Sequence, residues 1–142
     1  MLKILTMSLT LRRTMFSMLV ALVAPAPGPL QVRDHDAAWT APIAHSSRLN
    51  PLASRLDVVA GGAKIFQQRC TTCHGEDGRG TTKAPDLTRP DVQAQTDGAL
   101  FWKISSGNTH QGMPTFSFLP EPQRWQLVLQ LRALATTPPP AH

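Results

Sequence analysis

Three segments of the chain place apolar side chains at helical spacing, and none alternates apolar and polar residues in the manner of a half-buried strand. They lie at about residues 57–70, 97–107 and 121–134, with stretches rich in glycine or proline between them. The expected apolar faces consist of Val58, Val59, Gly62, Ile65, Phe66, Leu100, Phe101, Ile104, Trp125, Val128, Leu131 and Leu134. This pattern predicts an all-α fold with about three main helices and long irregular loops.

Residues that favour helix ends flank these segments. Asp57 and Asp97 are expected to cap the N-termini of the first two helices, and Gly107 is expected to end the second. The third helix is expected to begin near Glu121, with Pro122 in its first turn, where the missing N–H of proline costs nothing. A Thr-Thr-Pro-Pro-Pro run then ends it.

The N-terminal residues have the layout of an export signal. Arg12 and Arg13 precede an uncharged apolar run at residues 15–24, and small residues follow that run. The run is shorter than the roughly 20 apolar residues that a spanning helix needs. We therefore divide the chain into four parts. These are an export signal or N-terminal anchor (1–26), a Pro/Ala-rich linker or extended arm (27–56), a folded domain (57–136) and a Pro-rich tail (137–142).

The charge and cysteine content exclude several classes of protein. The formal charge of +5 drops to about +2 without residues 1–26, which hold three of the fourteen basic residues and no acidic one. That balance does not predict a nucleic-acid interface, which needs a concentrated basic surface. Two cysteines also exclude a disulfide-dense scaffold.

The two cysteines belong to the sequence Cys70-Thr71-Thr72-Cys73-His74, which is the Cys-x-x-Cys-His attachment motif for c-type haem. Thiols one helical turn apart can form thioethers with two vinyl groups of one porphyrin, and the adjacent imidazole can then bind the iron. The competing interpretations are a thioredoxin-like redox pair, a zinc site that also uses His110, and a structural disulfide.

Met113 is the candidate for the second axial ligand. The other four methionines lie in the expected leader, and Met113 stands between Gly112 and Pro114 in a polar loop. His/Met ligation closes the iron to small molecules and raises the reduction potential, as suits an electron carrier. His110, three residues earlier, and an open sixth position remain the alternatives.

Taken together, these motifs resemble the class I c-type cytochromes, in particular the small exported monohaem cytochromes of bacteria. Gly62 and Phe66 stand eight and four residues before Cys70, as in the first helix of that family, which packs closely on the last helix. Where the family commonly places an aromatic residue against this glycine, the chain has Gln130. The resemblance covers roughly residues 57–135.

The resemblance implies further haem-pocket residues. Pro85 and Leu87 match the family's Pro-x-Leu, in which the proline carbonyl accepts a hydrogen bond from the ligand imidazole and the leucine lies on the ring. Trp102 and Phe116 are the other candidates for contacts with the haem.

These observations predict an electron-transfer protein rather than an enzyme. It would carry one haem c and pass single electrons between extracytoplasmic, for instance periplasmic, redox partners. A membrane respiratory complex and a periplasmic dehydrogenase are the classes of partner considered, and contact with a membrane is expected only if the leader is retained. The alternatives are a cytochrome subunit or tethered module of a larger dehydrogenase or oxidase, and an open-site haem peroxidase or gas-binding protein.

Overall fold

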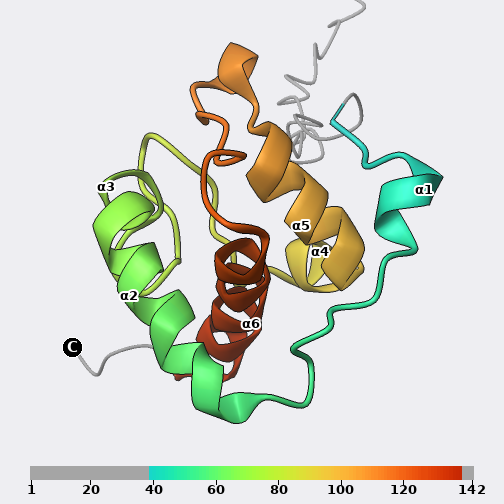
Figure 1. Cartoon of the computed structure of the whole chain (residues 1–142). Coiled ribbons are helices and arrows are strands. Elements are labelled where there is room, and N and C mark those ends of the chain that lie inside the picture. The colour runs from blue at the N-terminus through green and yellow to red at the C-terminus, as the bar shows by residue number, and fades with distance from the viewer. Residues whose placement is uncertain (1–38, 139–142) are drawn as a thin grey trace, which may run out of the picture. The chain divides into compact units, whose positions relative to one another are not determined.

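The computed structural model describes residues 39–138, and this part of the chain is helical (Figure 1). Its helices are α1 (Ile43–Ser46), α2 (Val59–Arg69), α3 (Thr71–His74), α4 (Pro90–Gln93), α5 (Asp97–Ser106) and α6 (Glu121–Thr136), with short 3₁₀ helices η1 (Leu56–Val58) and η2 (Thr109–Gln111). The described residues contain no strand, only an isolated bridge between Asn108 and Met113. The expected all-α cytochrome c fold is confirmed, with α2, α5 and α6 as its long helices.

Several expected features lie outside the described residues: the export signal or anchor at 1–26, residues 27–38 of the arm, and residues 139–142 of the tail. Within residues 39–138, no helix is long and apolar enough to cross a membrane.

Helix ends agree with the sequence except at the two expected aspartate caps. Thr96, not Asp97, caps α5, because its Oγ1 accepts a hydrogen bond from the N–H of Ala99 at 3.2 Å. The carboxylate of Asp97 instead accepts a hydrogen bond from Arg132 of α6 at 2.8 Å. The carboxylate of Asp97 therefore forms an ion pair with Arg132, which lies far along the chain, instead of capping α5 as the local sequence predicts.

Asp57 does not cap α2 either, but its partner is a neighbour in the sequence. Asp57 lies in η1, ahead of α2, and its two carboxylate oxygens accept hydrogen bonds from Arg55 at 2.8 and 2.7 Å. The remaining boundaries follow the sequence: α5 ends at Gly107 with φ of 64°, and α6 begins at Glu121 and ends before Thr137.

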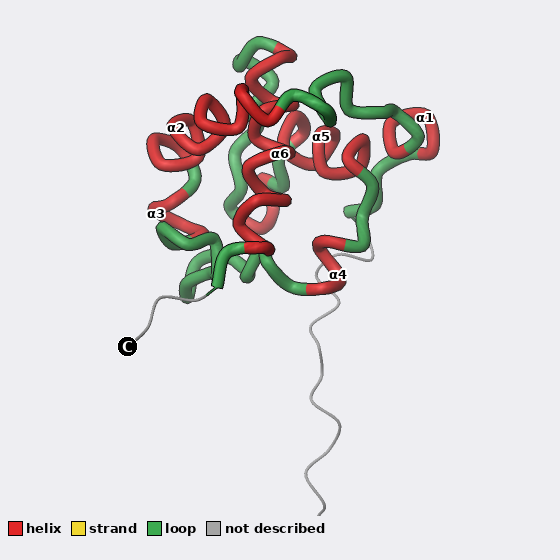
Figure 2. Tube along the Cα trace, turned by 90° about the horizontal axis from the view of Figure 1, so that it is seen from below, coloured by secondary structure: helices red, strands yellow, loops and turns green. Residues whose placement is uncertain are grey.

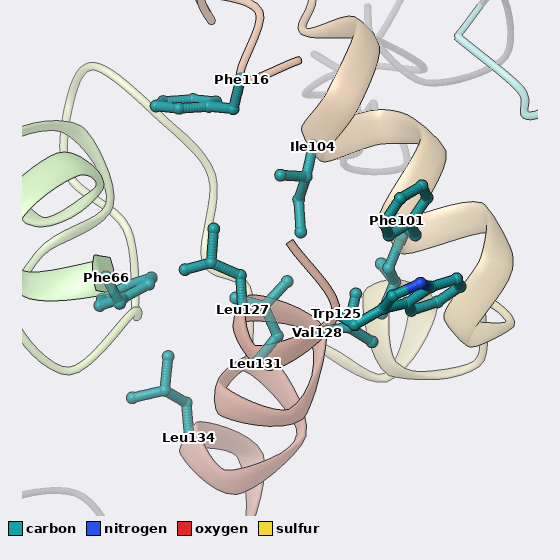
Figure 3. Packing of buried hydrophobic residues seen from close by; sticks show 10 residues of the cluster. Phe66, Phe101, Ile104, Phe116, Trp125, Leu127, Val128, Leu131 and Leu134 are labelled. Carbon is teal, nitrogen blue, oxygen red and sulfur yellow. The ribbon is translucent and has the colours of Figure 1, made fainter. Parts of the chain in front are cut away.

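The apolar core is built around α6, which contacts both α2 and α5 (Figures 1 and 2). Side chains from the three long helices and from the segment after Met113 converge there (Figure 3). Trp125, Phe66 and Val128 are the largest side chains that are fully buried. The complete set of buried apolar residues in this cluster is Phe66, Leu100, Phe101, Ile104, Phe116, Trp125, Leu127, Val128, Leu131 and Leu134.

Gly62 allows α2 to lie directly on the backbone of α6. A Cβ at this position would collide with the carbonyl oxygen of Gln126 and would lie 3.2 Å from the Cβ of Gln130. The close packing expected between the first and last helices is thus confirmed. Gln130 occupies the position beside the glycine where the resemblance would place an aromatic side chain.

The second half of the arm, residues 39–55, packs on the domain. Its helix α1 contacts α5, and Thr96 Oγ1 donates a hydrogen bond to the carbonyl of Ser46 at 2.6 Å. The guanidinium of Arg48 lies 4.8 Å from the ring centroid of Phe101 and forms an ion pair with Glu121 at 2.6 Å. Cation–π contacts, an ion pair and a hydrogen bond from a side chain to the backbone attach this part of the arm, so it is not a free tether.

We predict that Gly62→Ala lowers the free energy of unfolding by about 1–3 kcal/mol, because backbone atoms of α6 must move to admit the methyl group. The measurement is chemical denaturation of the haem-loaded protein, followed by circular dichroism.

Gly61→Ala is the matched control in the same helix. Its Cβ would meet only the end of the flexible Gln126 side chain, which can swing away. Equal stability of the two variants would contradict a backbone contact at Gly62.

Candidate functional site

The Cys-x-x-Cys-His sequence forms a single helical turn at the end of α2. Cys70 ends α2, its N–H bonded to the carbonyl of Phe66 at 2.8 Å, and it also precedes α3. The N–H groups of Cys73 and His74 both donate to the carbonyl of Cys70, at 3.1 and 2.9 Å. Residues three apart on a helix lie on the same face, so this turn brings the two thiols to one side. Both thiols are free and half-buried.

The imidazole of His74 is oriented by the loop that follows the turn. Its Nδ1 donates a hydrogen bond to the carbonyl oxygen of Pro85 at 3.0 Å, since a carbonyl can only accept. This bond leaves Nε2 as the nitrogen with a free lone pair, as metal-binding histidines commonly show. The contact that the resemblance implied for Pro85 is present.

Burial lowers the pKa of His74, although the hydrogen bond to Pro85 acts in the opposite direction. The imidazole is therefore favoured in its neutral form at neutral pH, and this is the form that binds metals. Burial, with a smaller contribution from Cys73, raises the pKa of Cys70 to about 11. A redox-active dithiol usually has a cysteine of lowered pKa, so the environment of Cys70 does not favour the thioredoxin-like interpretation.

Backbone contacts around Gly80 hold the segment that carries Pro85. The N–H of Gly80 donates to the carbonyl of His74 at 2.8 Å, and Thr81 Oγ1 donates to the carbonyl of Cys73 at 2.5 Å. Gly80 has φ of 85°, and a Cβ there would lie 2.6–2.9 Å from backbone atoms of Ala84, Pro85 and Asp86. The sequence pattern did not predict these roles of Gly80 and Thr81, and the only local sign of them is a glycine within the loop.

The loop that carries Met113 is fixed at both of its ends. Asn108 and Met113 exchange two backbone hydrogen bonds, at 2.9 and 3.0 Å, around the short helix η2. Gly112 adopts a left-handed conformation, and Gly107 packs directly against the backbone of Pro114. Beyond Met113, Thr115 Oγ1 donates to the carbonyl of Ser105 at 2.6 Å, which ties the loop to the end of α5.

The apolar cluster brings several of the expected haem-pocket residues together. Phe116 is buried within it, while Cys70, Leu87 and Met113 are partly buried and pack against it. Trp102 lies elsewhere, with its ring centroid 6.4 Å from that of His45 in the arm. The structure thus brings together residues from three segments that are distant along the chain, but it does not place Trp102 in this cluster.

His110 is exposed in η2. Across residues 39–138, no three or more His, Cys, Asp or Glu side chains are grouped closely enough to hold a metal ion. The structure therefore does not assemble the zinc site that the sequence left open.

The donor set fits haem c: two thiols on one turn, a neutral imidazole with Nε2 available, and a thioether packed on the same cluster. A comparison with known protein families gives a match over residues 57–129, just over half of the chain, to "Cytochrome C oxidase, cbb3-type, subunit III". The chain belongs to this family of c-type cytochromes. No match was found among curated proteins.

Membership of the subunit III family establishes the cofactor class and the general activity. Such c-type cytochrome domains hold haem c covalently, transfer electrons and are typically extracytoplasmic. Cys70 and Cys73 supply the cysteine pair that this attachment needs. Class I monohaem architecture is consistent with the match.

We predict that Gly80→Ala destabilises the haem-loaded protein by roughly 2–4 kcal/mol. The methyl group would strain a left-handed residue and also displace the backbone that holds Pro85. Thermal unfolding measures the loss, and the NMR signal of the His74 Nδ1 proton reports the hydrogen bond to Pro85.

Gly112→Ala provides the control for backbone strain alone. Its φ is also 85°, but nothing lies within 4 Å of the added Cβ, so a cost of about 1 kcal/mol is expected. If Gly80→Ala costs no more than this control, the packing of Gly80 does not hold Pro85 in place.

Proposed function

We propose that the protein is an exported monohaem cytochrome c that carries single electrons between extracytoplasmic redox partners. The observation that carries this proposal is the hydrogen bond from His74 Nδ1 to the Pro85 carbonyl, within a turn that also presents Cys70 and Cys73. A histidine fixed in this way has its tautomer and ring orientation set for binding iron through Nε2.

In this proposal Cys70 and Cys73 form the two thioether bonds, His74 is the proximal ligand and Met113 is the distal ligand. Haem c supplies one-electron chemistry between Fe(II) and Fe(III) when bound. The chain keeps His74 neutral by burial and directs its Nε2 through Pro85. The Met113 thioether would close the sixth position and favour the reduced state. Leu87 and Phe116 are proposed to contact the ring, because both belong to the cluster on which Cys70 and Met113 pack.

The proposed location rests on the sequence. Arg12, Arg13 and the apolar run at residues 15–24 favour export to the periplasm or an equivalent compartment. If this segment is not cleaved, it would anchor the domain at a membrane. The near-balanced charge of the remaining chain gives no support to a nucleic-acid partner.

A second candidate is a cytochrome subunit or tethered module of a larger oxidase. The matched family is described as a subunit of a cbb3-type oxidase, and this description favours the candidate. The two functions would use the same haem chemistry, but only the first protein would diffuse freely between its redox partners. Gentle solubilisation followed by native mass measurement separates them: a free carrier runs as a small protein, whereas a subunit runs within a larger complex.

We predict that Met113→Ala abolishes the weak far-red charge-transfer band of the oxidised protein and lowers the reduction potential, because the soft thioether no longer stabilises Fe(II). Absorption spectroscopy and a redox titration measure the two effects. The reduced variant should also bind carbon monoxide, which the reduced wild-type protein should not.

His110→Ala is the matched control for this loop, because His110 is exposed three residues before Met113. It should retain the far-red band. If His110 were the ligand, the oxidised wild-type protein would lack this band, and His110→Ala rather than Met113→Ala would open the reduced protein to carbon monoxide. Binding of carbon monoxide by the wild-type protein would indicate an open site.

We predict that the exported protein has the mass of the chain plus one haem, because both thiols add to vinyl groups of the same porphyrin. Cys70→Ser and Cys73→Ser should each retain at most one thioether. Mass spectrometry of the intact protein also shows whether the leader has been removed. An unshifted mass with two free thiols would contradict covalent attachment.

A further inference from the structure

An open cleft lies where the arm meets α5, the first turn of α6 and the segment after Met113. Its volume is about 510 Å³, and His45, Trp102, Thr115 and Glu121 each represent one of these four elements in its lining. Sites for small organic molecules usually have volumes of roughly 300–1,000 Å³. The cleft is therefore large enough for such a molecule and much larger than an inorganic ion needs.

Two arginine side chains bring positive charge to one wall of this cleft. The guanidinium carbons of Arg48 and Arg124 lie 4.8 and 4.7 Å from the ring centroid of Phe101, which also lines the cleft. Arg124 is fixed through Nε, which donates to the carbonyl of Leu119 at 3.1 Å, and through Nη1, which donates to Ser105 Oγ. Its Nη2 donates to no residue among those described, so this N–H group remains available to a ligand.

The lining of the cleft has a net positive charge. Among the described residues, Glu121 is the only carboxylate in the lining, and it accepts a hydrogen bond from Arg48 Nη2 at 2.6 Å. This bond leaves Arg48 Nε and Nη1 without an acceptor in residues 39–138. Two guanidiniums and one carboxylate leave one positive charge, with His45 taken as neutral. Such a lining suits a singly charged carboxylate, which a guanidinium can bind through paired hydrogen bonds.

The rest of the lining offers a hydrogen-bond donor and an apolar surface. Ser106, at the end of α5, is exposed, and its hydroxyl bonds to no described residue. Trp102 is half-buried, and its ring centroid lies 6.4 Å from that of His45. An indole ring next to guanidinium groups favours a ligand that has an apolar body as well as an anionic group.

We propose that this cleft binds a small organic monocarboxylate, with its carboxylate at Arg48 and Arg124 and its apolar body against Trp102. The proposed site involves no contact with haem and does not depend on Met113 as an iron ligand. Arg48 belongs to the arm, which precedes the family match at residues 57–129, whereas Arg124 lies inside that match. The site is therefore formed jointly by the arm and the family domain.

The test is calorimetric titration of the haem-loaded protein with benzoate, whose carboxylate and ring match the two parts of the cleft. We expect saturable binding of benzoate. Acetate lacks the ring and benzamide lacks the charge, so each should bind about tenfold more weakly or worse. In a proton–nitrogen correlation NMR spectrum, the indole N–H signal of Trp102 should shift during the titration, which locates the ligand.

Charge variants should change the affinity in opposite directions. Glu121→Gln keeps a hydrogen-bonding side chain but removes the carboxylate that competes for Arg48, so benzoate should bind about three- to tenfold more tightly. Arg48→Gln should weaken binding by about tenfold. Asp91→Asn and Arg89→Gln are the matched controls, because they make the same charge changes in an exposed ion pair that does not line the cleft. Each should alter the affinity by less than about twofold.

Absence of saturable benzoate binding by the folded, haem-loaded protein would overturn the proposal. Equal affinities for benzoate and inorganic phosphate would also overturn it, because the apolar body would then contribute nothing. Binding without a shift of the Trp102 signal would place benzoate outside the cleft, with the same consequence. If Arg48→Gln disrupts the fold, as circular dichroism would show, Glu121→Gln decides, and an unchanged or weaker affinity in that variant would contradict the proposal.

Discussion

The contact between Gly62 and the backbone of Gln126 is the constraint on which the rest of the fold depends. Only a residue without a side chain lets α2 lie this close to α6, and this crossing buries Phe66 in the core. Cys70 follows Phe66 by one helical turn, with its N–H bonded to the Phe66 carbonyl. The position of the cysteine pair is therefore set by helix packing several residues away.

The cofactor site is assembled from short segments that have little regular structure of their own. One turn presents the thiols and His74, and backbone hydrogen bonds around Gly80 keep the Pro85 carbonyl in reach of the imidazole. The Met113 loop is held separately, by its bridge to Asn108 and its bond to the end of α5. A domain of this size has a small apolar core. In the proposed function, covalently attached haem would complete this core and, through His74 and Met113, connect the two loops.

The arm that precedes the family domain packs on two of its helices. Arg48 packs on Phe101 of α5 and pairs with Glu121 of α6, so it connects these two helices. Ser105, on the same helix as Phe101, accepts the bond that fixes Thr115 beyond Met113. Segments before and after the haem motif thus both contact α5. Ordering the arm costs conformational entropy, which these contacts offset.

The sequence by itself determined the features that depend on local chemistry. These are the three helical segments, the end of α5 at Gly107, and the attachment motif with its histidine. Tertiary structure decided the features that depend on residues distant along the chain. Asp97 does not cap α5, because Arg132 of α6, distant along the chain, binds its carboxylate. Trp102 turned towards His45, and Lys103 became buried beside Trp39, because the arm covers α5. Helical periodicity specifies which residues share a face, but only the packed chain specifies what covers it.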